Sequence, residues 1–453
     1  MKIILRSIVF LFFCLTFFLG YFSIIGFETS KFNNQIIEKI KKYNQDFEVD
    51  LKDIKIVLDP FKLRFNAKTI GTKLTKKGKV IELENLKSQF LISSLFKEKL
   101  ILEKMEISTK TLEIRNLISF IRVINNKPEI YILDKIIKKG FVVADIELNF
   151  DEFGKLKKDI KINGLVKDLK IDLLNKYKID KTNLIFKYDL NNLNLNDINL
   201  RFNKINFKSN EIKLKKIKNN FEIEGEFQND FFELNKDSIE LFIQPIFPKI
   251  KIEKMKLNSK STFNFNMSNR YKIENFKILS DINLEELTFI NSLEVKKFFP
   301  EIKKKISFLK NKISINYSKK DLKINGKGKI LLQDNFDNIS YLIQKENQKL
   351  KFETFLEMQK NPFEIRSLDY EKDLTQKLSF NIKGNIGENN QTLFDLISIE
   401  EMKNKFEIKK LLFNEKFQII DFEKAKIFYL DKRNNQNEVN ILKKKKNYFL
   451  SKK

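Results

Sequence analysis

The strongest constraint on the fold is an alternation of apolar and polar residues with a period of two. It is clear in Phe263–Met267, which reads FNFNM, and in Ile313–Tyr317, which reads ISINY. In a β-strand, such an alternation places the apolar side chains on one face and the polar side chains on the other. It is typical of antiparallel strands with one buried and one solvated face. Because the pattern recurs along most of the chain, we predict a mainly β fold.

The apolar residues of these strands would form one continuous face rich in Phe, of which the chain has 45. The predicted helices are too few and too short to cover it. A second sheet could cover the face as in a sandwich, or the sheet could close into a barrel whose apolar side chains meet lipid. A long curved sheet could instead form a groove that lipid acyl chains fill. We take the following residues to represent the lining of that groove: Phe61, Leu63, Phe65, Leu184, Phe186, Tyr188, Phe263, Phe265, Phe380 and Ile382.

The N-terminus carries an uncharged apolar run, Ser7–Phe27, preceded by Lys2 and Arg6. As a helix it would extend roughly 31 Å, which matches the hydrocarbon core of a bilayer. The run ends in bulky residues rather than in the small residues of a signal-peptide cleavage site. We therefore expect an uncleaved, single-pass anchor. The basic residues before it favour a cytoplasmic N-terminus, with the rest of the chain exported.

We divide the chain into an N-terminus with a transmembrane anchor (1–27), a module of mixed elements (28–140), an extended β region (141–430) and a polar tail that frays (431–453). Apolar spacing predicts helical segments at residues 31–43, 88–97, 116–124, 129–139, 291–310, 334–347 and 391–405. The predicted fold class is thus a transmembrane helix followed by an elongated, twisted antiparallel β-sheet groove with a few helical insertions.

The composition excludes several kinds of chemistry. The chain has no His, and its one cysteine, Cys14, lies in the apolar run, so we expect no catalytic residue, no metal site and no cofactor. Gly326-Lys-Gly328 lacks the third glycine of a dinucleotide-binding loop, and we interpret it as a turn. The formal net charge of +27 comes almost entirely from Lys, scattered along the chain. Nucleic-acid readers favour clustered Arg, so we expect no nucleic-acid partner.

The first 115 residues also carry a specific order of elements. The anchor and an amphipathic segment precede the strand FEVDLKDIKI (47–56), and then come PFKLRF (60–65), IELENL (81–86), SSLFKEKL (93–100), ILEKMEI (101–107) and TLEIR (111–115). This order resembles the N-terminal region of the AsmA-like family, the group that includes AsmA, TamB and YhdP. The resemblance covers about a quarter of the chain.

The resemblance implies a bridge-like lipid-transfer protein of a diderm bacterium, with a chorein-like module at residues 28–140. It implies an anchor in the inner membrane and the bulk of the chain in the periplasm. The β-groove would shield phospholipid acyl chains on their way toward the outer membrane, with other envelope proteins completing the bridge. The alternative that the resemblance allows is a structural or assembly factor for the insertion of outer-membrane proteins.

Overall fold

The computed structural model describes most of the chain. The described residues are 2–30, 33–34, 37–38, 41, 48–92, 101–124, 128–173, 176–218, 220–244, 250–268, 270, 272–291, 295–319, 321–346, 349–387, 391–415, 418–431, 433, 435–444 and 447–452. The amphipathic helix predicted at 31–43 falls largely outside these residues.

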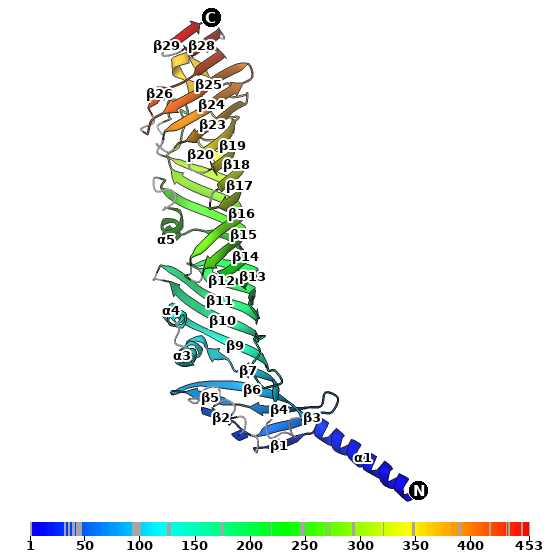
Figure 1. The fold of residues 1–453 in the computed structure, drawn as a ribbon. Coiled ribbons are helices and arrows are strands. Elements are labelled where there is room, and N and C mark those ends of the chain that lie inside the picture. Colours follow the sequence, from blue (N-terminus) through cyan, green and yellow to red (C-terminus); the bar gives the residue numbers. More distant parts are fainter. Residues whose placement is uncertain are drawn as a thin grey trace. The chain divides into compact units, whose positions relative to one another are not determined.

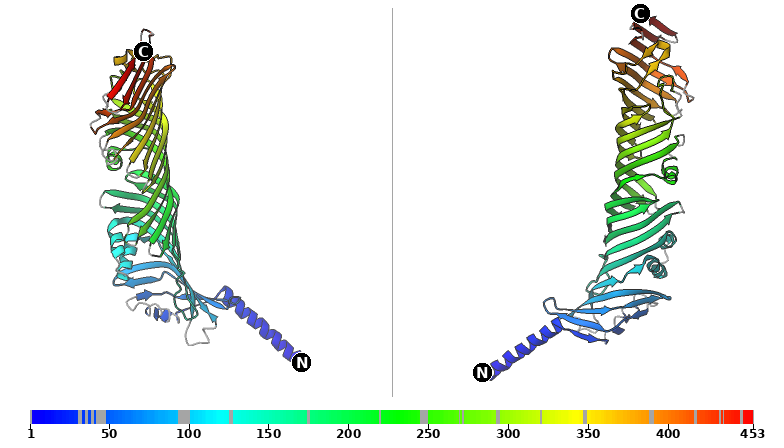
Figure 2. Two further views of the ribbon diagram at one scale, coloured as in Figure 1. Left: turned by 45° about the horizontal axis from the view of Figure 1, so that its top comes forward. Right: turned by 180° about the vertical axis from the view of Figure 1, so that it is seen from behind.

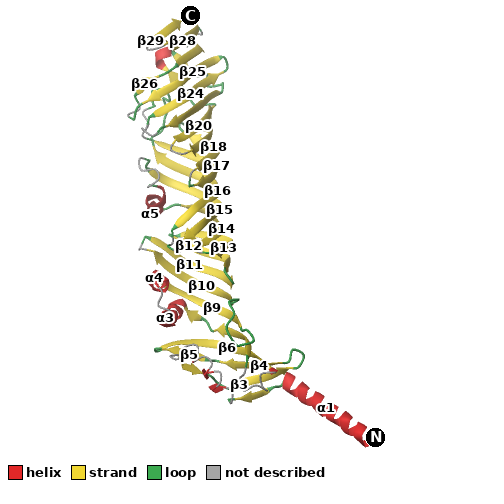
Figure 3. Cartoon of the chain, in the orientation of Figure 1, coloured by secondary structure: helices red, strands yellow, loops and turns green. Residues whose placement is uncertain are grey.

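The chain is mainly β and antiparallel, with an apolar N-terminal helix and few other helices, as the alternation predicts (Figure 3). It divides into two compact units, unit 1 (Met1–Ile223) and unit 2 (Glu224–Lys453). The helices that suggested a boundary near residue 140 pack inside unit 1.

Helix α1 (Lys2–Ile24) has no buried residue between Arg6 and Ile24 and is apolar and long enough to cross a membrane. It ends where the chain turns at Gly26 into β1 (Phe27–Thr29), which pairs with β3 (Ile54–Asp59). Gly26 has φ +67°, and a Cβ atom there would lie 2.2 Å from the carbonyl oxygen of Ile56. Only glycine fits this close approach, so the join between the helix and the sheet is sterically defined.

The remaining strands of unit 1 also pair antiparallel, although those before residue 137 do not all pair in sequence order. They are β2 (Glu48–Asp50), β4 (Arg64–Ile70), β5 (Lys73–Lys76), β6 (Lys79–Leu91), β7 (Leu102–Thr109), β8 (Leu112–Glu113), β9 (Ile137–Asn149), β10 (Lys161–Leu173), β11 (Tyr177–Asp189), β12 (Asn192–Phe202), β13 (Ile205–Ile217) and the start of β14 (Asn220–Glu233). From β9 to β13 each strand pairs with the next one in the sequence.

Helices α3 (Ile114–Ile124) and α4 (Pro128–Ile136) confirm the helical pair predicted at 116–124 and 129–139. They lie against the same side of β9 and β10 (Figure 1, Figure 2). Ile114 and Ile118 of α3 are buried against Ile137 and Val142 of β9. Phe120 of α3 also packs against Ile81 and Leu83 of β6, so the helices cover the apolar face beside β6, β9 and β10.

Unit 2 is a second run of sequential antiparallel strands. It contains the end of β14, α5 (Lys236–Ser238), a π-helical turn (Ile239–Ile243), β15 (Ile252–Ser268), β16 (Ile273–Ile290), β17 (Lys305–Ser318), β18 (Asp321–Leu331), β19 (Phe336–Glu346), β20 (Lys349–Met358), β21 (Glu364–Ile365), a 3₁₀ turn (Arg366–Leu368), β22 (Tyr370–Glu371), β23 (Leu378–Ile386), β24 (Thr392–Glu401), β25 (Asn404–Phe413), β26 (Ile419–Asp421), β27 (Lys424–Leu430), β28 (Gln436–Lys444) and β29 (Asn447–Lys452). The short pair β21–β22 forms a separate two-stranded sheet.

Several helices predicted from apolar spacing are wrong. Residues 88–91 continue β6, the predicted helix at 291–310 runs into β17, and the segments at 334–347 and 391–405 hold β19, β24 and the start of β25. Short apolar runs fit both the helical and the strand period. Pairing with a neighbouring strand on each side decides in favour of the strand.

Three further expectations also differ from the structure. The tail predicted to fray forms the paired strands β28 and β29. Gly326 and Gly328 lie within β18 rather than in a turn. The strand predicted from Phe61 onward begins only at Arg64, and the residues before it form the β3–β4 turn.

Candidate functional site

The apolar face of unit 2 is built from lateral rows of side chains that cross the strands. Directly paired residues in an antiparallel sheet project to the same face, so the strand register defines each row. One row contains, in order, Ile313, Gly326, Tyr341, Thr354, Ile382 and Ile397. A neighbouring row contains Ile315, Ile324, Ile343 and Phe352. The face thus continues from strand to strand across the unit.

One end of this face is covered by two segments of the same chain, residues 295–304 and 359–377, which we call the caps. Phe299 and Phe363 of the caps contact Phe380 of β23, with ring centroids 5.9 and 5.1 Å apart. Met358 and Leu378 are completely buried beneath them. We call this part of the face the covered end, and it is a closed protein core.

Buried hydrogen bonds hold the caps in place. The side chain of Gln333 accepts from the backbone N–H of Glu301 (2.9 Å) and donates to the carbonyl oxygen of Pro362 (2.8 Å), so it ties both caps to β18 and its turn. Asn361 Nδ2 donates to Asp337 Oδ2 over 2.7 Å. Burial raises the pKa of the Asp337 carboxyl to about 6.

A second group of polar contacts lies at the C-terminal end of the second cap. Tyr370 donates its hydroxyl proton to Glu401 Oε2 over 2.7 Å. Lys372 Nζ donates to the carbonyl oxygens of Gln359 (2.7 Å) and Asp373 (2.8 Å), and burial lowers the pKa of its ammonium group. Buried polar groups with such partners favour a single arrangement of the caps.

The opposite end of the face, which we call the open end, carries a stripe of aromatic rings. The stripe contains Phe227, Phe263, Phe265, Phe276 and Tyr317, with successive ring centroids 5.5, 6.1, 6.1 and 6.1 Å apart. The Phe side chains of the stripe are only half-buried, and Tyr317 is 38% exposed. The stripe is therefore in contact with solvent, in contrast with the rings under the caps.

Glycines lie directly opposite aromatic residues at three places on the apolar faces. Gly164 pairs with Phe186 in unit 1, and Gly326 pairs with Tyr341 and Gly384 with Phe352 in unit 2. A Cβ atom at these glycines would lie 2.4, 2.2 and 2.8 Å from an atom of the facing ring. Each ring thus lies flat over its glycine, in the space that the side chain of any other residue would fill. The aromatic side chain therefore protrudes less from the sheet at these points than it would over a residue with a Cβ atom.

The structure separates the predicted lining residues into several environments. Phe263 and Phe265 lie at the open end, Ile382 lies half-buried between the two ends, and Phe380 lies at the covered end. In unit 1, Leu184, Phe186 and Tyr188 project to one face of β11 and are half-buried, and Phe186 also packs near the α3–α4 helices. Phe65 is half-buried beside the core of β3 and β4.

Phe61 and Leu63 do not occupy a strand face. Phe61 is 97% exposed and Leu63 is 64% exposed in the β3–β4 turn, and Leu63 has φ +50°. The Asp59–Pro60 dipeptide, which favours the start of a turn, was the signal against a strand at this point.

Phe227 and Phe276 belong to the open end but were not identified from the sequence. Asn275, with φ +53°, interrupts the alternation immediately before Phe276. The register of β15 and β16 shifts nearby, between Asn264 and Asn266. The bulge breaks the period of two only before Phe276, which is itself in step with Ile278, as Phe227 is with Ile223, so the alternation was a signal that could have identified both residues.

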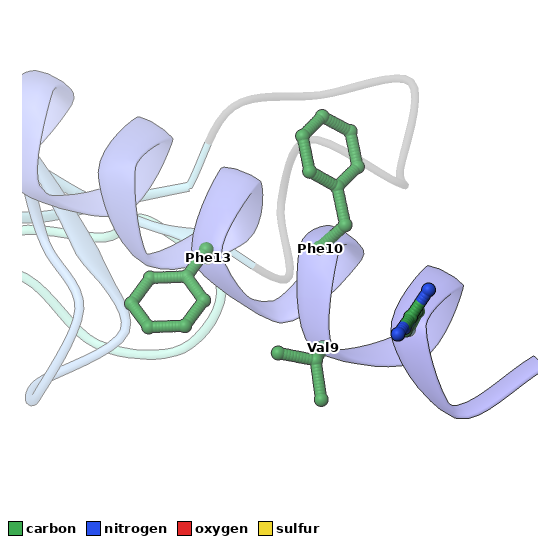
Figure 4. Close-up of a pocket in the computed structure, with 4 residues that line it drawn as sticks. Val9, Phe10 and Phe13 are labelled. Carbon is green, nitrogen blue, oxygen red and sulfur yellow. The ribbon is translucent and has the colours of Figure 1, made fainter. Parts of the chain in front are cut away.

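A further apolar hollow among the described residues is a groove on α1. It is lined by Arg6, Val9, Phe10 and Phe13 (Figure 4). All of these residues come from one face of a single exposed helix, so the groove is a feature of the helix surface rather than a formed binding site. Among the described residues, no group of three or more His, Cys, Asp or Glu side chains is placed to hold a metal ion.

Comparison with known proteins adds no family to this description. No family model matches the chain, and no curated protein matches its sequence.

Proposed function

We propose that this protein is an inner-membrane-anchored, periplasmic lipid-binding protein. The apolar face of its sheet would bind phospholipid acyl chains, and the protein would contribute to phospholipid transport toward the outer membrane. The transmembrane-capable helix α1 and the order of elements in the first 115 residues support the membrane setting. Binding and shielding of acyl chains require no catalytic group.

The observation that carries the proposal is the contrast between the two ends of the apolar face of unit 2. At the covered end the chain supplies its own caps, and the aromatic rings beneath them are buried. At the open end the rings of the stripe stay half-exposed. Extended apolar surface in contact with water is unfavourable and marks a site where an apolar partner binds.

An acyl chain matches the open end in chemistry and in size. Ring faces and branched aliphatic side chains gain dispersion contacts with methylene groups and place no polar group on them. The rows cross the strands with a spacing of about 4.8 Å per strand, so a long apolar chain could lie along them and touch several strands.

Site-specific crosslinking in membranes tests the proposal. A photoreactive phenylalanine analogue at Phe276 should form adducts with phospholipid, whereas the same analogue at Asn264, on the opposite face of β15, should not. Phe265→Asp places a charge beside Phe276 and should abolish the adduct, while the matched change Asn264→Asp should leave it intact. Equal adducts at both positions, or none in the otherwise unchanged protein, would refute the proposal.

A further inference from the structure

An exposed phenylalanine is held at the tip of the β3–β4 turn. Asp59 Oδ1 accepts the backbone N–H of Lys62 (3.1 Å), and the carbonyl oxygen of Leu63 accepts the N–H of Ile92 (3.0 Å). These bonds fix the turn on both sides of Phe61, whose side chain is 97% exposed. The turn thus presents a large apolar side chain to the outside as part of its ordered geometry.

The β9–β10 loop presents a second apolar tip. Asp151 Oδ1 accepts the backbone N–H groups of Phe153 (2.9 Å) and Lys155 (2.8 Å), which orders a tight turn. Phe153 is 79% exposed, and Leu156 is 43% exposed beside it. The turn again projects its apolar residues outward.

The root of this loop is attached to the part of the sheet that carries the first tip. Phe150 is buried in the same cluster as Ile54 and Ile56 of β3. Its backbone N–H donates to the carbonyl oxygen of Glu103 in β7 (2.9 Å). Both tips are therefore connected to the small region of unit 1 around β3.

That region is also where α1 joins the sheet. Phe27 pairs with Ile56, so the helix ends beside the half of β3 that leads into the β3–β4 turn. Phe61 lies five residue steps after Ile56, which corresponds to at most about 17 Å of extended chain. If α1 spans the bilayer, the first tip lies within reach of the headgroup region at its C-terminal end.

We propose that unit 1 makes a second contact with the lipid bilayer, beside α1, through the tips Phe61–Leu63 and Phe153–Leu156. Aromatic side chains concentrate in the interfacial region of membranes, where the ring leaves water. Lys62 and Lys155, each within its tip, would lie near the lipid phosphates. Such a contact would limit the rotation of unit 1 relative to the membrane about the C-terminal end of α1.

The inference rests on the membrane anchoring by α1 in the proposed function, but not on acyl-chain binding in unit 2. Its test uses the full chain with Cys14→Ser, reconstituted into vesicles of phosphatidylethanolamine and phosphatidylglycerol. Single cysteines at positions 61, 153 and 190 carry an environment-sensitive fluorophore, and lipids with a nitroxide on the headgroup or on the upper acyl chain act as quenchers.

Position 190 is a matched control. Leu190 is 53% exposed in the β11–β12 turn, and β11 lies six strand steps from β3, which leads into the first tip. Six steps amount to roughly 29 Å along the sheet. The same turn lies only one step from the start of β10, where the loop of the second tip ends, so position 190 is a distant control for position 61 and a near control for position 153. We expect nitroxide lipids to quench the labels at 61 and 153 at least about threefold more than the label at 190.

Each other outcome overturns the inference. Equal quenching at all three positions would indicate that the protein lies on the membrane without specific tips. Blue-shifted emission at 61 and 153 without quenching by lipid would indicate that the tips are buried against protein, either the same chain or another copy of it. A label on α1 at Phe17 tests the anchor separately, and the crosslink at Phe276 tests acyl-chain binding, so the failure of one proposal is distinguishable from the failure of another.

Discussion

Substituting two phenylalanines of the same sheet face should produce different energetic penalties. Phe380 lies beneath the caps and is buried, whereas Phe265 lies in the stripe and is half-buried. Replacing a buried Phe by Ala removes its transfer free energy and leaves a cavity, which costs about 3–5 kcal/mol of unfolding free energy. A half-buried Phe loses roughly 100 Å² of apolar contact and leaves no closed cavity, which costs about 2–3 kcal/mol.

The additional penalty of Asp over Ala separates the two environments more sharply. At Phe380 the carboxylate would be enclosed without a partner, so Phe380→Asp should cost several kcal/mol more than Phe380→Ala. At Phe265 water can reach the carboxylate, so Phe265→Asp and Phe265→Ala should have nearly equal stability. Both variants at a site lack the Phe ring, so the difference in unfolding free energy between the Asp and the Ala variant reports the effect of the carboxylate alone.

Thermal unfolding of the full chain, followed by circular dichroism, provides the assay. For a unit of this size, 1 kcal/mol corresponds to a change in melting temperature of about 2–4 °C. We expect Phe380→Ala to melt roughly 6–20 °C lower and Phe380→Asp to fail to fold its unit. Phe265→Ala and Phe265→Asp should differ from each other by less than about 2 °C. A large gap between these two variants would mean that the open end is a closed core, and the reasoning would fail.

Other changes in unit 2 test the glycine–aromatic pairs of the apolar face and the polar contacts of the caps. Gly326→Ala should push the ring of Tyr341 away from the sheet and so reduce the amount of phospholipid that copurifies with the protein in native mass spectrometry. Adding Tyr341→Ala should restore the bound phospholipid. An unchanged lipid content in Gly326→Ala would contradict the role of the flat-lying ring. The folded-state pKa of Asp337 is raised from 3.8 to about 6, so its stabilising contribution is present below about pH 4 and is lost as the pH rises through 6. Asp337→Asn should therefore raise the melting temperature relative to the unchanged protein above pH 7, by a margin that shrinks toward pH 5; a constant margin would contradict the assignment. Tyr370→Phe leaves the buried carboxylate of Glu401 without one donor and should lower the unfolding free energy by about 1–3 kcal/mol, measured by denaturant titration; no change would show that the bond is dispensable.

The sequence predicts the strands well wherever the alternation is local. Residues 263–267 and 313–317 show a clear period of two and lie in β15 and β17. The helical pair α3–α4 was also readable, because Pro128 starts a helix after a break in the pattern. These features depend only on neighbouring residues.

The division of the face into a covered and an open end depends on contacts that no local pattern contains. Phe265 and Phe380 occupy equivalent alternating positions in their own strands. They differ only because residues 295–304 and 359–377, distant in sequence, fold over Phe380. Likewise, residues 336–346 have the apolar spacing of a helix, and only their pairing with β18 and β20 makes them a strand. Burial of this kind becomes visible only in three dimensions.

The sequential pairing of β15 to β20 also bears on how unit 2 reaches its fold. Each strand from β16 to β20 pairs with the strand before it, so the contacts that form the sheet join residues close in the chain. When contacts are this local, closing the loops between them costs little chain entropy, and the protein folds faster than β proteins whose contacts join distant residues. As the chain emerges during synthesis, each new strand can pair with the free edge of the strand made just before it. The growing end of the sheet then exposes the edge of one strand at a time.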